Sequence, residues 1–466
     1  VHGRKQWAAI GINGGRAWTN DIQLDGLPVM SGGYNEVSVT PNTEGLGEVR
    51  VIANNFSAEY GRGQGVISMS TRSGTNAYHG EASYRIRNEA LMANSRANKA
   101  NWSVQQPKGV PRPPFKVHEM GGAIGGPILK EKLFFFSSYH YLRFNQAIDR
   151  LLTVPTELEA VGNFSKTLVR NEAGVGVPAA IFNPWAVTQL GPDLYQRTPI
   201  PNADLSGFPD SKYAKLWFTY YPLPNRTPDD EFNANNFYAR IVQRLRRHNL
   251  NNRVDYRRGR HSIYGSGGLT KSSNVTPRPY GKAPVNDAPW IIADQNPYGQ
   301  IGDTIVVSPT VVVDLRYGIS RTNAMTYKGN KEGWTEELYD SFGVPRNIWP
   351  LFAIWGSAPT LPMTEGAFDK NRSRQSGHTL TGSVTKVRGR WTHKFGGELR
   401  NQLSNYTDSE QIAASYPGRT SGGNFSFQYV TASGGSSSLN TTTVQQGLTM
   451  ARYFLAAPGW WIRPGA

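Results

Sequence analysis

The chain has 466 residues, a formal net charge of +16 at pH 7 and no cysteine, which excludes a disulfide framework, thiolate zinc sites and a cysteine nucleophile. Its 12 Trp, 22 Tyr and 19 Phe residues are too many for a disordered chain. Together with 50 Gly and 30 Pro they are typical of many strands joined by turns, so the composition predicts an all-β fold.

The first 76 residues form a segment with its own pattern. Gly61, Gly63 and Gly65 allow positive φ angles and close approach of the backbone. The apolar residues that alternate over 66–71 predict a short, half-buried strand. We expect a compact unit that differs from the rest of the chain.

From residue 78 onward, pairs of alternating segments are separated by very short turns at 130–132, 258–259, 308–309 and 388–390. Glycine or proline occurs in three of these four turns, which is ordinary turn chemistry. The pattern predicts hairpins and about ten strands in all. The expected strands are 78–88, 117–127, 133–144, 246–257, 260–271, 298–307, 311–324, 378–388, 391–402 and 443–456.

Long polar connections separate the hairpins at about 145–235, 272–297, 327–376 and 404–441. Loops of this length are uncommon in compact domains, yet here they recur at every second connection. Strict alternation of short and long connections places all short turns at one end of the sheet and all long loops at the other. This arrangement predicts a transmembrane antiparallel β-barrel with long extracellular loops.

The strands alternate between an apolar and a polar face. In the segment 311–321, Leu315 and Tyr317 point one way while Asp314 and Arg316 point the other. One face can therefore meet lipid and the other can line a wet lumen. Several aromatic residues at strand ends are expected to form interfacial girdles: Tyr141, Phe144, Tyr256, Tyr317, Trp391 and Tyr453.

Several other functions find no support in the sequence. The basic clusters at 240–261 and 386–394 lie within strand-like alternation, with no recognition helix or RNP-like stretch, so nucleic-acid binding is not expected. The eight histidines show no metal-binding spacing, and no cofactor motif or set of nucleophile, base and acid can be assembled. No apolar run is long enough for a membrane-spanning helix. We expect neither an enzyme nor a bound cofactor.

Motifs in the first half of the chain carry a family resemblance. The stretch "GLGEVRVIANNFSAEYGRGQGVISMSTRSGTNAYHGEASYRIRNEAL" resembles the second half of the plug domain of TonB-dependent outer-membrane receptors, followed by the first barrel strand. The stretch "MGGAIGGPILKEKLFFFSSYHYLR" at 120–143 is similar to the Oar-like subgroup of these receptors. The residues that carry the plug motif are Glu48, Tyr60, Gly61, Gly63, Gly65, Thr71 and Gly74.

The resemblance implies two domains: the C-terminal half of a plug at 1–76, and the N-terminal portion of an outer-membrane β-barrel at 77–466. It also implies a bacterial outer-membrane location and uptake of a bulky or scarce solute. A TonB-type complex would act through a region upstream of Val1. The chain begins at Val1 without a methionine and shows no secretory signal, so a processed chain or a fragment is expected. Such barrels have about 22 strands, and the roughly ten expected here would form only part of one.

Contacts with the solute are expected among aromatic residues of the long loops. The candidates are Trp217, Tyr220, Trp290, Trp349 and Trp355. A monomeric barrel in contact with outer-membrane lipid is expected. The alternative is a surface-exposed structural or adhesive outer-membrane β protein without transport, and a TonB box upstream of Val1 would discriminate against it.

Overall fold

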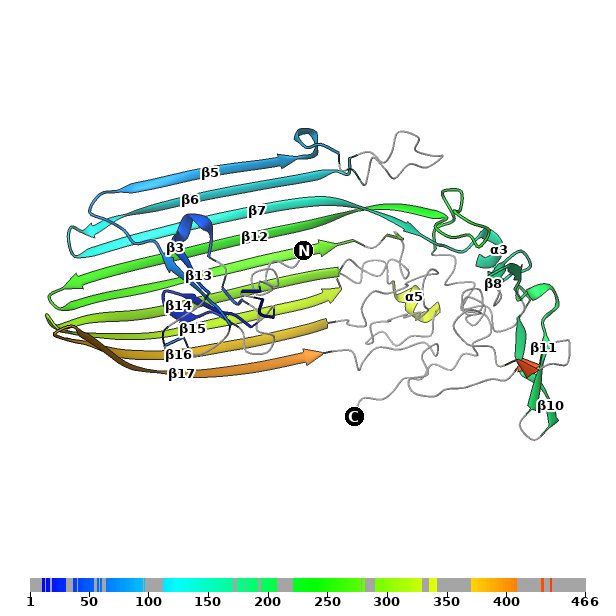
Figure 1. Cartoon of the computed structure of the whole chain (residues 1–466). Coiled ribbons are helices and arrows are strands. Elements are labelled where there is room, and N and C mark those ends of the chain that lie inside the picture. Colours follow the sequence, from blue (N-terminus) through cyan, green and yellow to red (C-terminus); the bar gives the residue numbers. More distant parts are fainter. Residues whose placement is uncertain are drawn as a thin grey trace.

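The computed structural model describes most of the first 408 residues, and in it the chain forms two main sheets (Figure 1). The described residues are 11–12, 14–16, 19–30, 37–39, 41–53, 57, 59–60, 64–94, 96, 112–170, 174–179, 181–191, 194–207, 221–277, 279–280, 290–328, 335–341, 370–408, 429–430 and 436–437.

The first sheet, here called the small sheet, has four strands in the order β2-β1-β4-β3. Its strands are β1 (Asp21–Leu24), β2 (Leu27–Pro28), β3 (Leu46–Ile52) and β4 (Val66–Thr71), and the short 3-10 helix η1 (Thr43–Gly45) precedes β3. The predicted strand at 66–71 is confirmed as β4, which pairs in parallel with β1 and antiparallel with β3.

The second sheet, here called the wall, has nine antiparallel strands in the order β17-β16-β15-β14-β13-β12-β7-β6-β5. Its strands are β5 (His79–Asn88), β6 (Phe115–Leu129), β7 (Leu133–Leu152), β12 (Phe237–Arg258), β13 (His261–Thr276), β14 (Trp290–Ser308), β15 (Val311–Lys328), β16 (Lys370–Arg388) and β17 (Trp391–Asp408). Because each strand pairs with its neighbours along the chain, β5 and β17 are the two edges and the described sheet is not closed.

The four predicted short turns are confirmed, and all lie at one end of the wall (Figure 1). Nine of the ten expected strands are present, and the expected strand at 443–456 lies outside the described residues. All of these strands except β5 are longer than expected: β12 has 22 residues and β7 has 20. The extra residues lie mainly at the long-connection end. A strand needs only about 9–11 residues to cross a bilayer, so the extra residues extend beyond the membrane.

The predicted alternation of faces is also confirmed. Outward-facing positions carry many large apolar side chains that are exposed. The inward-facing positions are mostly polar and frequently buried, with buried apolar exceptions such as Phe134 and Phe136 on β7. The exposed outward residues include Tyr84, Ile124, Val254, Ile301, Leu315, Leu380, Trp391, Phe395 and Leu399. No helix among the described residues has the length and hydropathy needed to span a membrane.

The long connection between β7 and β12 has structure of its own where it is described. A four-residue helix, α3 (Glu157–Ala160), begins with a capping box formed by Thr156 and Glu159. Phe164, Ile181 and Leu205 are almost completely buried beside it. Its other elements are β8 (Leu168–Arg170), β9 (Gly176–Pro178), β10 (Phe182–Gly191), β11 (Leu194–Pro199) and η3 (Pro201–Ala203).

Four short elements complete the described structure. The 3-10 helix η2 (Glu89–Leu91) follows β5, and the helix α5 (Glu336–Ser341) lies between β15 and β16. The two-residue strands β18 (Tyr429–Val430) and β19 (Ser436–Ser437) pair with each other. None of these elements joins the wall.

Candidate functional site

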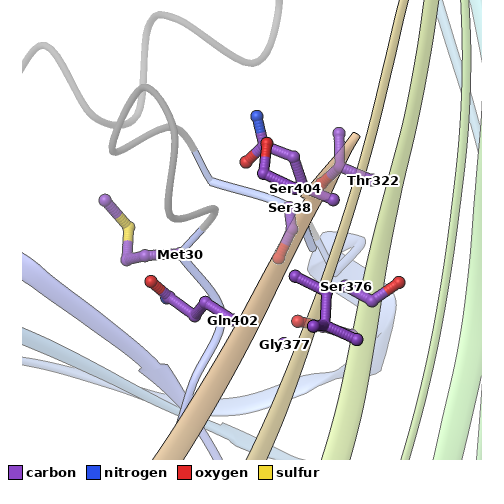
Figure 2. Close-up of a pocket in the computed structure, with 10 residues that line it drawn as sticks. Met30, Ser38, Thr322, Ser376, Gly377, Gln402 and Ser404 are labelled. Carbon is purple, nitrogen blue, oxygen red and sulfur yellow. The ribbon is translucent and has the colours of Figure 1, made fainter. Parts of the chain in front are cut away.

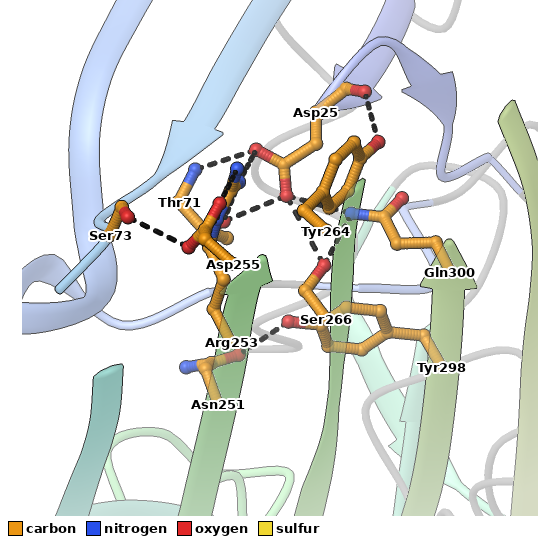
Figure 3. A network of polar contacts seen from close by, with 10 residues as sticks. All are labelled: Asp25, Thr71, Ser73, Asn251, Arg253, Asp255, Tyr264, Ser266, Tyr298 and Gln300. Atoms are coloured by element: carbon orange, nitrogen blue, oxygen red, sulfur yellow. Dashed lines mark hydrogen bonds and ion pairs between the residues drawn. The ribbon is translucent and has the colours of Figure 1, made fainter. Parts of the chain in front are cut away.

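The small sheet lies against the inward face of the wall, and its most connected residue sits in a tight turn. Leu24 pairs with Leu27, which leaves Asp25 and Gly26 as a two-residue hairpin loop. Both loop residues have positive φ, 50° at Asp25 and 82° at Gly26, as an Asp-Gly type I′ turn requires. The turn directs the Asp25 side chain toward the wall (Figure 3).

The Asp25 carboxylate joins the end of β4 to two strands of the wall (Figure 3). Thr71 donates to it twice, from its backbone N at 2.8 Å and from Oγ1 at 2.8 Å. Gln300 on β14 donates from Nε2 at 2.7 Å, and Ser266 on β13 donates from Oγ at 3.3 Å. Only 5% of the Asp25 side chain is exposed, so these donors replace the water that the charge would otherwise bind.

Arg253 on β12 supplies the positive charge of this network. Its Nη1 lies 3.3 Å from Asp25 Oδ1, and its Nε and Nη2 donate to Asp255 at 3.0 and 2.8 Å. The guanidinium carbon lies 4.5 Å from the ring centre of Tyr264, which is a cation-π distance. Asp255 accepts a further hydrogen bond from Ser73 Oγ at 2.7 Å. One largely buried arginine therefore links both carboxylates and both sheets.

Two ion pairs attach the small sheet near the β17 edge of the wall. Arg400 Nη2 lies 3.4 Å from Asp21 Oδ2, and both side chains are largely buried. Lys394 pairs with Glu59. Burial alone would raise the pKa of Glu59, but hydrogen bonds from Lys394 and Ser57 outweigh it and hold the pKa below its ordinary value.

A third set of contacts attaches η1 to the opposite side of the wall. Ser83 on β5 donates to Glu44 Oε1 at 3.1 Å, and a Cβ at Gly121 on β6 would lie 2.4 Å from the same oxygen. A side chain at position 121 would therefore require the Glu44 carboxylate to move. Burial opposes ionisation of Glu44, but its backbone hydrogen bond and those from Ser83 and Thr43 lower its pKa overall.

The small sheet has an apolar core of its own, whereas its attachment to the wall is mainly polar. Its core residues are Ile12, Ile22, Leu24, Val29, Met30, Val37, Val39, Ile67 and Met69. On the wall, Tyr298 packs against this core and donates from its hydroxyl to Asn251 at 3.1 Å. A unit with its own core and a polar boundary can separate from its surroundings without exposing that core, because water can satisfy the freed polar groups.

A cavity of about 190 Å³ lies between the small sheet and the wall strands β15, β16 and β17 (Figure 2). Met30 and Ser38 form its small-sheet side. Its wall side is lined by uncharged hydroxyl and amide side chains such as Thr322, Gln375 and Gln402. Such a lining can hydrogen-bond neutral polar groups but offers no charge to an ionic ligand.

The structure places the predicted motif residues in different settings. Thr71 lies in the Asp25 network, and Gly74 passes so close to the wall that a Cβ would lie 2.3 Å from Phe135 O. Gly65 packs against Ile12. Glu48 is exposed on β3, and Tyr60 donates its backbone N to Ser57 O at 3.0 Å. Gly61 and Gly63 lie outside the described residues.

Most of the predicted loop contacts fall outside the described residues. Trp217, Tyr220, Trp349 and Trp355 lie outside the described residues. Trp290 is the first residue of β14, where its backbone pairs with β13 and β15. These five residues remain a prediction.

The partners of Asp21 and Asp25 could not be predicted from the sequence. Arg253 is separated from Asp25 by more than two hundred residues, and Arg400 from Asp21 by still more. The available signal was that Arg253 and Arg400 stand at inward-facing positions of their strands. Within the described part of the chain, no group of three His, Asp or Glu residues is placed to hold a metal ion.

An antiparallel wall with an apolar outer face and a polar inner face is the architecture of an outer-membrane β-barrel. The chain belongs to the family described as outer membrane beta barrel domain, whose model matches residues 70–459. The protein is accordingly a bacterial outer-membrane protein.

One curated relative is the TonB-dependent transporter Oar of Myxococcus xanthus, which is 28% identical over 131 residues, 28% of this chain and 12% of the relative. The outer membrane transporter YddB from Escherichia coli matches 90% of this chain and 44% of its own, with 10% identity and a TM-score of 0.48. The FrpB iron transporter from Neisseria meningitidis matches 84% of this chain and 53% of its own, with 10% identity and a TM-score of 0.39. The chain therefore spans only part of the length of each. These similar proteins are transporters, not enzymes.

Proposed function

We propose that the chain is part of a TonB-dependent outer-membrane transporter, in which the first 76 residues belong to a plug and the remainder forms the first portion of the barrel. The observation that supports this most strongly is the small sheet, which has its own core and is attached by polar contacts to the inward face of a lipid-facing wall. Similarity to the Myxococcus transporter supports the same assignment. A bulky or scarce solute would be bound at the long-loop side of the plug.

In this proposal a TonB-type complex pulls on a region that precedes the small sheet, and the polar contacts of Asp25, Asp21 and Glu44 yield. Breaking them replaces protein hydrogen bonds by hydrogen bonds to water, which is much less costly than exposing an apolar core. No covalent chemistry is required. A monomeric barrel without a nucleic-acid partner remains our expectation.

The proposal is tested by the accessibility of a cysteine buried at the boundary. Ser138 on β7 is 1% exposed and donates to Asn42 of the small sheet at 3.0 Å. Because these 466 residues contain no cysteine, Ser138→Cys creates the one thiol within them. In cells that carry the intact protein, we expect a membrane-permeant maleimide to label it faster when the inner membrane is energised. Deleting the TonB-type protein should remove the increase.

Thr310→Cys, in the exposed turn between β14 and β15, is the matched control and should be labelled equally in all conditions. Labelling of Ser138→Cys that does not depend on energisation or on the TonB-type protein would contradict transport. It would favour the adhesive alternative.

A further inference from the structure

The outward face of the wall changes in character toward the long-connection end. On β12 the outward positions run from Val254, Asn252 and Leu250 to His248 and then to Arg246 and Arg244. On β16 they run from Val384 and Leu380 to His378, and beyond these to Arg374 and Arg372. The apolar positions define the part of the face that meets hydrocarbon. The basic positions lie beyond it, on the side of the long loops.

Tyrosine-histidine pairs mark the change at three places on this face. The Tyr hydroxyl lies 2.7 Å from His Nδ1 in Tyr84–His118, 2.8 Å in Tyr139–His248 and 2.9 Å in Tyr317–His378. In each pair the histidine lies on the neighbouring strand, two residues from the position directly opposite the tyrosine. The displacement is always toward the end of the wall that carries the long connections. Side chains with an apolar body and a polar tip favour the membrane-water interface, so these pairs place that interface on the wall.

Three arginines gather just beyond the Tyr139–His248 pair. Arg246 on β12 stands directly opposite Arg143 on β7, and Arg244 is the next outward residue on β12. Like charges directly opposite each other destabilise a pair of strands. The guanidinium of Arg246 donates to Asn145 Oδ1 at 2.9 Å and to Leu245 O at 3.0 Å. Both acceptors are neutral, so these bonds do not offset the mutual repulsion.

A second cluster of three arginines repeats this arrangement beyond the Tyr317–His378 pair. Arg321 on β15 stands opposite Ser376, and Arg374 and Arg372 are the next outward residues on β16. None of the ion pairs found among the described residues joins any of the six arginines to a carboxylate. The described structure therefore shows two concentrations of positive charge that are not compensated by its own acidic groups.

We propose that these two clusters bind phosphate-bearing headgroups of lipids in the membrane leaflet beside the long loops. Guanidinium groups bind phosphate oxygens through paired, charge-assisted hydrogen bonds, and a bridging anion turns the repulsion between facing arginines into attraction. The clusters adjoin the lipid-facing surface and directly follow the interfacial tyrosines and histidines, which favours a membrane lipid over a soluble anion. This inference does not depend on the proposed transport function.

The test uses intact protein extracted from outer membranes, exchanged into a neutral detergent and mixed with diphosphoryl lipid A. The variants are R143Q/R244Q/R246Q and R321Q/R372Q/R374Q, and bound lipid is counted by native mass spectrometry. We expect each triple variant to weaken retention at its own cluster by roughly a hundredfold, because three basic side chains near the membrane surface each add to the attraction for anionic lipid. Heat-modifiable migration in gels verifies that each variant is folded.

The matched control is R258Q/R260Q/R388Q, which removes the same charge from the short-turn end of the wall. The control should retain lipid A as the unaltered protein does. A molar excess of inorganic phosphate over lipid A should not displace the lipid. The proposal fails if the triple variants retain lipid normally, if the control loses as much as they do, or if lipid A without phosphates is retained equally. Displacement by inorganic phosphate would show an anion site that is not specific for lipid.

Discussion

Single residues decide how the small sheet is attached to the wall. Asp25 has a positive φ and a buried charge, both of which are unfavourable unless the surroundings compensate for them. Donors from Thr71, Gln300 and Arg253 provide that compensation. The residue is thus stable only while the small sheet and the wall are in contact.

Replacing Asp25 by asparagine should weaken this attachment by about 2 kcal/mol, because Arg253 then loses one of its two carboxylates and a donor amide faces other donors. The Thr71 amide should exchange its hydrogen about thirtyfold faster, as hydrogen exchange with mass spectrometry would show. Glu48→Gln, which changes an exposed carboxylate on β3, should leave exchange unaltered. Equal exchange in both variants would contradict the importance of Asp25.

Gly74 shows the effect of backbone proximity. An added Cβ would lie 2.3 Å from Phe135 O and 2.8 Å from Gly126 O, and neither backbone atom can turn aside. We expect Gly74→Ala to cost about 1–3 kcal/mol and to reduce the folded fraction in heat-modifiable gel migration. Gly299→Ala on β14 meets no atom within 4 Å and should fold normally. A normal folded fraction in the Gly74 variant would show that the chain can shift at this point.

Among the elements, the connection between β7 and β12 behaves as a folded unit rather than as an open loop. Phe164, Ile181 and Leu205 are at most 1% exposed, and backbone hydrogen bonds join Phe164 to Ala203 and Leu205 to Gly162. Asn236 adds hydrogen bonds of 2.8 Å to both the backbone N and O of Val154. The wall is therefore extended by an ordered projection at its long-connection end.

Phe164→Ala should destabilise this projection by about 3–5 kcal/mol, because it leaves a cavity in a very small core. Limited proteolysis should then cut within 153–236 while the wall remains intact. Leu223→Ala removes a side chain that is 50% exposed and should not increase cleavage. Resistance of the Phe164 variant to protease would indicate that the projection is held mainly by its hydrogen bonds.

At the scale of the whole molecule, the attachment of the small sheet depends on several ionised carboxylates. The pKa values of Glu44 and Glu59 are both lowered from the ordinary 4.5. A lowered pKa in the folded state means that the charged form stabilises that state. The contribution is fully present above pH 4.5 and is lost as the pH falls through the folded-state value.

We therefore expect the small sheet to be most firmly attached at neutral pH and to loosen in acid below about pH 4.5. Proteolysis of residues 41–76 by an acid-active protease, measured from pH 6 to pH 3, would follow this change. The double variant E44Q/E59Q should show a flatter profile. A profile that does not differ from that of the unaltered protein would assign the acid response to other groups.

The sequence by itself determined the strands, the two faces of the wall and the end at which the short turns lie. These features depend on local periodicity and turn chemistry, which neighbouring residues encode. The alternation of Leu315 and Tyr317 with Asp314 and Arg316 was sufficient to assign one strand to a lipid-facing wall. The strand lengths were underestimated, because beyond the membrane the outward residues become polar and the apolar alternation no longer identifies a strand.

Only the tertiary structure decided which charges meet. Asp25 and Arg253, or Arg143 and Arg246, are brought together by strand order and register, and neither is visible in local sequence. A shift of one residue in register would send each side chain to the other face of the wall. Long-range pairing depends on the whole set of strand contacts, and so the attachment of the small sheet and the arginine clusters followed from the fold alone.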